Sequence, residues 1–283
     1  MDAHTSGSKT ALMVCAYRAR ASRWPRPLFV DPWADPLAGR DGHELARHYD
    51  LRFPQMELWL ALRVAYLDRL IDLAIDRLGV RQVVLLGAGY DTRAARLPRA
   101  SVRFFEVDHP ATQAEKRERM AALDGYPDDA ATHVACNFER EDPVERLASA
   151  GFDGREPAVV IWEGVVSYLT EAAVRATATR LATGLDPRSL LAFDFLGKNQ
   201  AEGNRMSPAD LDARAYFGEL GEPLRFGIDD VLPLLYECGF RWVRVLDFNE
   251  LALELVDDYQ RERKFRFQRI ALAAPRTPAA GWP

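Results

Sequence analysis

Two glycines, Gly87 and Gly89, follow a short apolar run and precede a segment that can form a helix. Glycines in such a turn let the backbone approach a bound molecule closely, because no Cβ atom stands in the way. A dinucleotide-binding turn needs a third glycine three residues after the second, and that position is Thr92. The chain also lacks the glycine-rich run ending in Gly-Lys-Ser or Gly-Lys-Thr that a P-loop requires. The turn therefore predicts close contact with a ligand and gives no support for phosphate binding.

An aspartate, Asp108, ends the next apolar run, FFEVD, about twenty residues after Gly87. In nucleotide-binding folds, a carboxylate at that spacing accepts hydrogen bonds from ribose hydroxyls. Two alternatives stay open, since Glu106 shares the same face of the run and Asp108 could cap the helix that Pro110 begins. A glycine turn without a phosphate signature, followed by a ribose carboxylate, indicates a nucleoside cofactor that lacks phosphates. S-adenosyl-L-methionine is the common one.

The composition is that of a globular protein, with 283 residues of which 48% are hydrophobic and 28% charged. A formal net charge of -5 argues against a nucleic-acid partner. No apolar stretch approaches the ~18 residues of a membrane-spanning helix, so we expect no membrane contact. The three cysteines are widely spaced, which argues against a disulfide framework or a zinc site and fits a reducing compartment. We therefore expect a cytoplasmic protein without a metal, whose partner is a small molecule. Its oligomeric state stays open.

Seven short apolar runs alternate with helical segments over most of the chain and must position these residues. Strands that alternate with helices predict an α/β fold, with a mostly parallel seven-stranded sheet and helices on both faces. The runs occupy residues 81–90, 102–108, 133–137, 157–164, 189–196, 241–248 and 267–274.

Residues 1–80 are predicted to form an N-terminal helical cap, and residues 81–283 the ligand-binding core. One helix should reach about Arg20 and a longer one should run from beyond Pro54 to Gly79, with a proline-rich loop between them. Residues 197–226 interrupt the alternation after the fifth strand. An insertion there would lie at the ligand-binding edge of the sheet, so we expect a lid; an exposed decoration is the alternative.

Six blocks of the sequence, from about residue 8 to residue 240, resemble the leucine carboxyl methyltransferase family, specifically its bacterial branch of polyketide and other small-molecule O-methyltransferases. The resemblance implies a Rossmann-like methyltransferase fold, S-adenosyl-L-methionine as the cofactor, and O-methyl transfer. The blocks are SKTALMVCAYRA, PLFVDPWADPLAG, VVLLGAGYDTRAARLP, FFEVDHPATQAEKRE, VVIWEGVVSYLT and GEPLRFGIDDVLPLLYECGF.

The resemblance also implies a set of cofactor-binding residues. Lys9 and Arg63 would hold the methionine carboxylate, Asp108 the ribose, and Asn137 with Phe138 the adenine. Asn137 stands where the family usually has Asp, so it would make a weaker hydrogen bond to the adenine amino group. The remaining positions, against the methionine portion, are Gly87, Ala88, Gly89, Glu163 and Gly164.

The acceptor is less constrained by the sequence. Tyr168 matches a family tyrosine on the acceptor side and could orient the acceptor; a half-buried packing residue is the alternative. Arg205, Arg214 and Tyr216 in the insertion could recognise an anionic substrate; solvated charges on a lid are the alternative. No His–Asp pair is evident as a general base, which favours an acceptor that is already ionised, such as a carboxylate. We therefore expect an O-methyltransferase acting on a carboxylate, or an acidic hydroxyl, of a polyketide-type small molecule. A non-catalytic cofactor-binding regulatory protein and a nicotinamide-dependent oxidoreductase are the alternatives.

Overall fold

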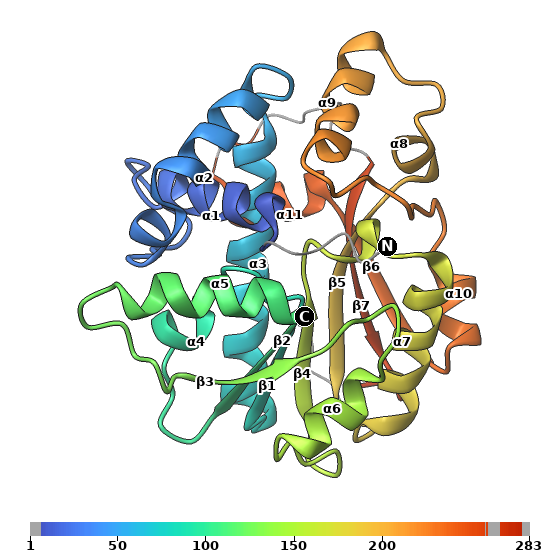
Figure 1. Cartoon of the computed structure of the whole chain (residues 1–283). Coiled ribbons are helices and arrows are strands. Elements are labelled where there is room, and N and C mark those ends of the chain that lie inside the picture. The colour runs from blue at the N-terminus through green and yellow to red at the C-terminus, as the bar shows by residue number, and fades with distance from the viewer. Residues whose placement is uncertain (1–6, 258, 260–266, 279–283) are drawn as a thin grey trace.

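A seven-stranded sheet forms the centre of the molecule in the computed structural model, which describes residues 7–257, 259 and 267–278 (Figure 1). The strand order is β3-β2-β1-β4-β5-β7-β6. Six strands fall within the apolar runs, and β3 overlaps its run but begins two residues before it, so the predicted sheet is confirmed. The strands are β1 Gln82–Leu86, β2 Arg103–Asp108, β3 Ala131–Ala135, β4 Ala158–Trp162, β5 Leu190–Leu196, β6 Trp242–Asp247 and β7 Gln268–Ala274.

The first five strands are parallel, and β7 runs antiparallel to both β5 and β6. The chain starts the sheet at β1, moves outward through β2 to β3, and then returns to place β4 on the other side of β1. The loops that follow β1 and β4 therefore diverge above the sheet. Such a reversal opens a crevice at the carboxyl ends of the strands, where open α/β sheets bind ligands.

The sheet separates two hydrophobic cores, because successive residues of each strand point to opposite sides. Val83 and Leu85 of β1 enter one core, whereas Val84 and Leu86 enter the other. The first core is covered by α3 Met56–Leu78 and α11 Phe248–Leu255. The second is covered by α6 Pro143–Ser149, α7 Glu171–Gly184 and α10 Leu232–Glu237. Helices on both faces were expected and are found.

The N-terminal part contains a helix that the sequence reading missed. The predicted helices are present as α1 Lys9–Ala21 and α3, which Gly79 ends in a left-handed conformation. Between them, however, the supposed proline-rich loop holds α2 Ala34–Asp50. Pro36 lies in the first turn of α2, where a missing backbone N–H costs nothing, so it does not break the helix. Side chains of α1, α2 and α3 share one core with the sheet.

The insertion after β5 folds into two helices, α8 Lys198–Glu202 and α9 Pro208–Glu219. The Ser207 side chain caps α9 by accepting a hydrogen bond from the Asp210 amide, as its sequence suggested. Figure 1 shows α8 and α9, in orange, at the same end of the molecule as the blue helices α1 and α2. The Tyr216 hydroxyl of α9 donates to the Leu45 carbonyl of α2 at 3.4 Å, so the insertion packs against the N-terminal helices.

None of the helices in the described part of the chain combines the length and apolarity needed to cross a membrane.

Candidate functional site: two cavities that meet at a tyrosine

A cavity of about 660 Å³ lies above the carboxyl ends of β1, β2, β3 and β4. The first turn of α1 and residues 221–225, which follow α9, close its other side. Nine of the ten predicted cofactor residues line it: Arg63, Gly87, Ala88, Gly89, Asp108, Asn137, Phe138, Glu163 and Gly164. Residues spread over a hundred positions therefore converge because parallel strands end at the same edge of the sheet.

The glycine turn after β1 has a backbone that no other residue would fit. Gly87 and Gly89 have φ angles of 66° and 49°, in the left-handed region that favours glycine. A Cβ atom on Gly87 would stand 2.1 Å from a methyl group of Val165, and one on Gly89 would stand 2.8 Å from Ala11. The turn thus lets the backbone of residues 87–89 form part of the cavity wall.

Asp108 is held rigidly at the end of β2. Its carboxylate accepts hydrogen bonds from the amides of Gly89 and His109, the latter at 2.6 Å. Burial raises the pKa of Asp108 to about 6, although both amide hydrogen bonds act to lower it. The side chain is therefore mostly ionised at pH 7 and can still accept hydrogen bonds from two hydroxyl groups of a ligand.

The structure decides between the two acidic candidates on this strand. Glu106 is buried and forms an ion pair with Lys116, which also donates to the carbonyl oxygen of Asp91. Glu106 does not line the cavity, whereas Asp108 does. Of the two carboxylates, only that of Asp108 is available to a ribose.

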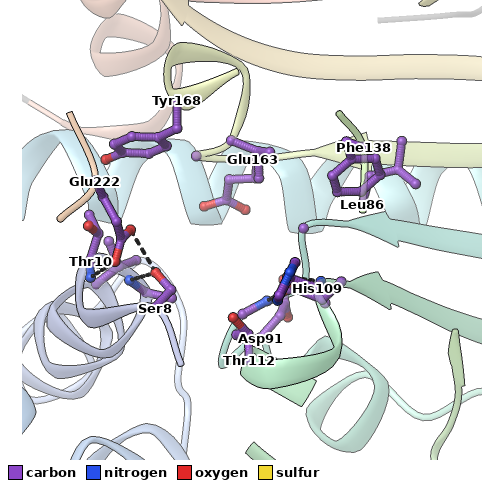
Figure 2. A pocket seen from close by; sticks show the side chains of 18 of the residues that line it. Ser8, Thr10, Leu86, Asp91, His109, Thr112, Phe138, Glu163, Tyr168 and Glu222 are labelled. Atoms are coloured by element: carbon purple, nitrogen blue, oxygen red, sulfur yellow. Dashed lines mark hydrogen bonds between the residues drawn. The ribbon is translucent and has the colours of Figure 1, made fainter. Parts of the chain in front are cut away.

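The end of the first cavity that Phe138 and Leu86 line suits a flat ring. Phe138 packs against Trp162 with ring centroids 6.4 Å apart, and Leu86 lies beside it (Figure 2). The Asn137 side-chain oxygen accepts a hydrogen bond from the Glu139 amide at 3.0 Å, so one of its two lone pairs is already used. Apolar contact from Phe138 and Leu86, with a partly engaged amide nearby, fits an adenine.

The opposite end contains a network of buried charges. Arg63 donates to Glu163 at 2.8 Å and to Asp194 at 2.7 Å, and Arg93 lies 2.6 Å from the other oxygen of Glu163. Burial acts to raise the pKa of Glu163, but Arg93 and Arg63 outweigh it and hold this pKa below its ordinary value. Glu163 is consequently ionised, as an acidic partner for an ammonium group should be.

Lys9 is the predicted cofactor residue that the structure does not bring to the site. Its side chain is exposed, and it does not line the cavity. Thr10, Ala11 and Val14, on the inner face of α1, line it instead. Because residues of a helix are spread around its axis, Lys9 points to solvent when Thr10 and Ala11 point inward.

A second cavity, of about 510 Å³, lies between the N-terminal helices and the insertion. It shares four lining residues with the first: Met56, Arg63, Gly164 and Tyr168. Tyr168 is in the short helix η1 Val166–Tyr168, directly after β4, and Figure 2 shows it above Glu222. Burial, followed by the charge of Glu222, raises the pKa of Tyr168 well above its ordinary value, so its hydroxyl stays protonated.

The three insertion residues proposed for substrate recognition separate in the structure. Arg205 and Arg214 line the second cavity. Tyr216 lines neither of the two cavities; it is buried and stacks on Tyr49 with ring centroids 5.7 Å apart. Tyr216 therefore fixes the insertion to α2 and does not face a substrate.

Several residues of the site were missed by sequence reasoning. Asp194 stands inside the apolar strand SLLAFDFL, and a charge in a buried strand has to be paired, so a signal for it was present. Arg93 and Glu222 each lie within one of the blocks that resemble the family, but neither has a residue type or spacing that indicates a role in the site. Neither of these two could be recognised without the fold.

Comparison with known proteins agrees with this architecture. The family model described as leucine carboxyl methyltransferase matches residues 11–182, more than half of the chain. A protein of Mycolicibacterium smegmatis assigned as an S-adenosyl-L-methionine-dependent methyltransferase is 36% identical over 239 residues, covering 76% of this chain and 79% of its own. A Mycobacterium tuberculosis protein with the same assignment is 34% identical over 223 residues, covering 72% and 71%.

A crystal structure of a protein from Thermobifida fusca, described as a methyltransferase, has the same fold. It superposes with a TM-score of 0.64 at 16% identity and covers 96% of both chains.

Proposed function

The chain belongs to the leucine carboxyl methyltransferase family, and from this premise we propose that it methylates a carboxylate, or an acidic hydroxyl, of a small molecule. As a member of this family it is an S-adenosyl-L-methionine-dependent methyltransferase. We further propose, from the resemblance to the bacterial small-molecule branch, that the acceptor is a polyketide-type compound.

The first cavity has the chemistry to hold S-adenosyl-L-methionine. Asp108 would accept hydrogen bonds from the ribose hydroxyls, Phe138 would cover the adenine, and Glu163 would pair with the ammonium group. Nη2 of Arg93 is buried without a hydrogen-bond partner among the described residues, and the two hydrogen bonds from Arg63 to Glu163 and Asp194 leave its Nη2 unused. A ligand carboxylate would satisfy these donors, so Arg93 is the better partner of Arg63 than the exposed Lys9.

The cofactor supplies an electrophilic methyl group on a sulfonium, which an acceptor oxygen attacks in line with the carbon–sulfur bond. The protein's own part is to align the acceptor and exclude water. Tyr168 lines both cavities and keeps its proton, so it can donate a hydrogen bond that orients an acceptor oxygen. For the same reason, it cannot act as a general base.

The observation that carries the choice of acceptor is the engagement of Asp194, the buried carboxylate of the second cavity. One oxygen accepts from Arg63 at 2.7 Å, and the other accepts from the Gly164 amide. Both oxygens of Asp194 are thus already occupied by hydrogen-bond donors, and no histidine lines the second cavity in the described part of the chain. An acceptor that is already ionised at neutral pH needs no base.

Methyl transfer from radiolabelled S-adenosyl-L-methionine to a panel of aromatic carboxylic acids and phenols tests this proposal. A carboxylate acceptor gives a methyl ester, from which mild base releases methanol, whereas a methyl ether resists the same treatment. We expect a base-labile product. A base-stable product on a ring carbon or a nitrogen would contradict the proposal.

A further inference from the structure

The two cavities are joined at one place. Arg63, Gly164 and Tyr168 line both, and the paired carboxylates of Glu163 and Asp194 hold Arg63 in position from its two sides. A methyl group bound in the first cavity can be transferred to a second molecule only where the cavity that holds this molecule adjoins the first. The second cavity adjoins the first at Arg63, Gly164 and Tyr168, which is where an acceptor would have to lie.

Aromatic rings form much of the wall of the second cavity. The rings contact one another, with centroids 5.2 Å apart for Tyr49 and Phe217, 6.1 Å for Tyr168 and Phe217, and 6.2 Å for Phe53 and Phe267. Rings held by such contacts present fixed faces and edges, against which a flat ring system packs well. A wall of this kind, around about 510 Å³, suits the body of a ligand with fused or linked aromatic rings.

The charges of the second cavity favour an anion. Its lining contains four arginines, Arg52, Arg63, Arg205 and Arg214, against two aspartates, Asp194 and Asp210. Arg63 is paired with Glu163 and Asp194, and Arg52 lies 3.2 Å from Asp212.

The two arginines of the insertion have no such partners. No carboxylate of the described residues forms an ion pair with Arg205 or Arg214. Arg214 donates Nε and Nη2 to the carbonyl oxygens of Gln200 and Ala201, and these contacts fix its guanidinium without neutralising it. Arg205 is exposed at the cavity and has a φ of 53°, an uncommon backbone for a residue other than glycine. Two uncompensated guanidinium groups therefore face this compartment.

We propose that the second cavity is the acceptor site and that it takes a flat aromatic anion, whose ring system lies among the aromatic side chains and whose acidic group is bound by Arg205 and Arg214. This rests on the proposed function, because it identifies the acceptor of that reaction. The group next to Tyr168 and Arg63 receives the methyl, and the insertion selects the acceptor by its charge.

A matched pair of fluorescent probes distinguishes the contribution of the aromatic rings to binding from the contribution of the negative charge. 1-Anilinonaphthalene-8-sulfonate and N-phenyl-1-naphthylamine share one aromatic body, and only the first carries an anionic group. We expect both to bind the full-length protein saturated with S-adenosylhomocysteine, with one site for the sulfonate per chain. Arg205→Gln and Arg214→Gln should each weaken binding of the sulfonate about tenfold and leave the neutral probe unchanged. Arg77→Gln, at an exposed arginine that lines neither cavity, is the matched control.

A second variant fills the cavity without touching its charges. Ala209 is exposed at the second position of α9 and lines the second cavity, so Ala209→Trp should weaken both probes. Ala172→Trp is the control, because Ala172 is exposed at the same position of α7 and lines neither cavity.

Three results would overturn the proposal: displacement of the sulfonate probe by S-adenosylhomocysteine, equal binding of the sulfonate to parent and both arginine variants, or unchanged binding of both probes to Ala209→Trp. Calorimetry with S-adenosylhomocysteine distinguishes these from failure of the proposed function. A parent protein that binds the probes as expected but does not bind S-adenosylhomocysteine would refute the methyltransferase assignment and leave the anion site standing.

Discussion

The carboxylate of Glu222, which follows α9, accepts a hydrogen bond from the hydroxyl of Ser8 at 2.9 Å (Figure 2). Its other oxygen accepts from the Thr10 amide at 3.3 Å, in the first turn of α1. Segments 214 positions apart in sequence thus meet across the first cavity. A negative charge at the positive end of a helix is favourable, so this contact holds the insertion and α1 together.

Breaking this contact should speed the release of the cofactor product. We expect Glu222→Gln and Ser8→Ala each to raise the dissociation rate of S-adenosylhomocysteine, measured by stopped-flow fluorescence. The double variant should show a coupling free energy of about 1 kcal/mol, because the hydrogen bond between Ser8 and Glu222 is the one contact that both changes affect. The bonds of Ser8 to the Ala11 amide and of Glu222 to the Thr10 amide are each affected by one change alone. Glu202→Gln, an exposed residue of α8, is the control. Strictly additive effects would mean that the two side chains do not act together.

Asp108 should make cofactor binding depend on pH. Ribose hydroxyls favour the ionised carboxylate, and burial raises the pKa of Asp108 to about 6 in the free protein. Affinity for S-adenosylhomocysteine should therefore fall about tenfold between pH 7 and pH 5, as the carboxylate takes up a proton. Calorimetry on Asp108→Asn should show weaker binding without this pH dependence. His109→Gln serves as the control, since that imidazole also lines the cavity; if it alone removed the dependence, the assignment to Asp108 would be wrong.

Arg63 should be essential for stability, because it neutralises two buried carboxylates. Arg63→Ala leaves Asp194 without a cationic partner among the described residues and leaves Glu163 with Arg93 alone, so we expect a loss of about 3–5 kcal/mol in the free energy of unfolding at pH 7. The lowered pKa of Glu163 means that its stabilising contribution is present at neutral pH and is lost as the pH falls through that pKa. Because this pKa lies below the ordinary value of 4.5, the difference between parent and variant should stay constant from pH 7 to pH 5 and narrow below about pH 4.5 in urea denaturation. A difference that stays constant below this pH as well would argue against stranded charge as the cause.

Substitutions of Lys9 and Arg93 test which of the two residues binds the methionine carboxylate together with Arg63. Lys9 is exposed, so Lys9→Ala should change the affinity for S-adenosylhomocysteine by less than about twofold. Arg93→Lys keeps the charge but loses the planar guanidinium, which can donate two hydrogen bonds to one carboxylate. It should weaken binding of S-adenosylhomocysteine by about tenfold. Removal of the first α1 residues would not separate these cases, because it also deletes the contact with Glu222. A large loss of affinity for S-adenosylhomocysteine in Lys9→Ala would show that Lys9 does bind the carboxylate.

Tyr168 should affect the rate of methyl transfer without acting as a base. Tyr168→Phe removes one donated hydrogen bond, so we expect kcat to fall about tenfold while cofactor affinity stays unchanged. With a carboxylate acceptor, the single-turnover rate of the parent should be flat between about pH 6 and pH 9, because a carboxyl group of pKa ~4 is ionised throughout. A slope near one per pH unit would show that the acceptor loses a proton in this range and is a phenol.

Local sequence patterns were enough to place the sheet and most of the residues that line the first cavity. Apolar runs of strand length are a local signal, and parallel strands end at a common edge wherever they lie in the chain. Gly87, Asp108, Asn137 and Glu163 each follow or end such a run, so their convergence was predictable. The choice between Asp108 and Glu106 needed the fold, because the two share a face and Lys116 neutralises one of them.

Tertiary structure decided everything that depends on contacts between distant segments. The burial of Asp194 against Arg63 and the contact of Glu222 with Ser8 join residues 131 and 214 positions apart. Helix α2 escaped prediction because its one proline, Pro36, looks like a loop residue until the helix start is known. The directions of Lys9 and Tyr216 follow from how α1 and α9 are rotated about their axes. That rotation is set by which side of each helix its neighbours bury, and the spacing of residues along one segment does not contain it.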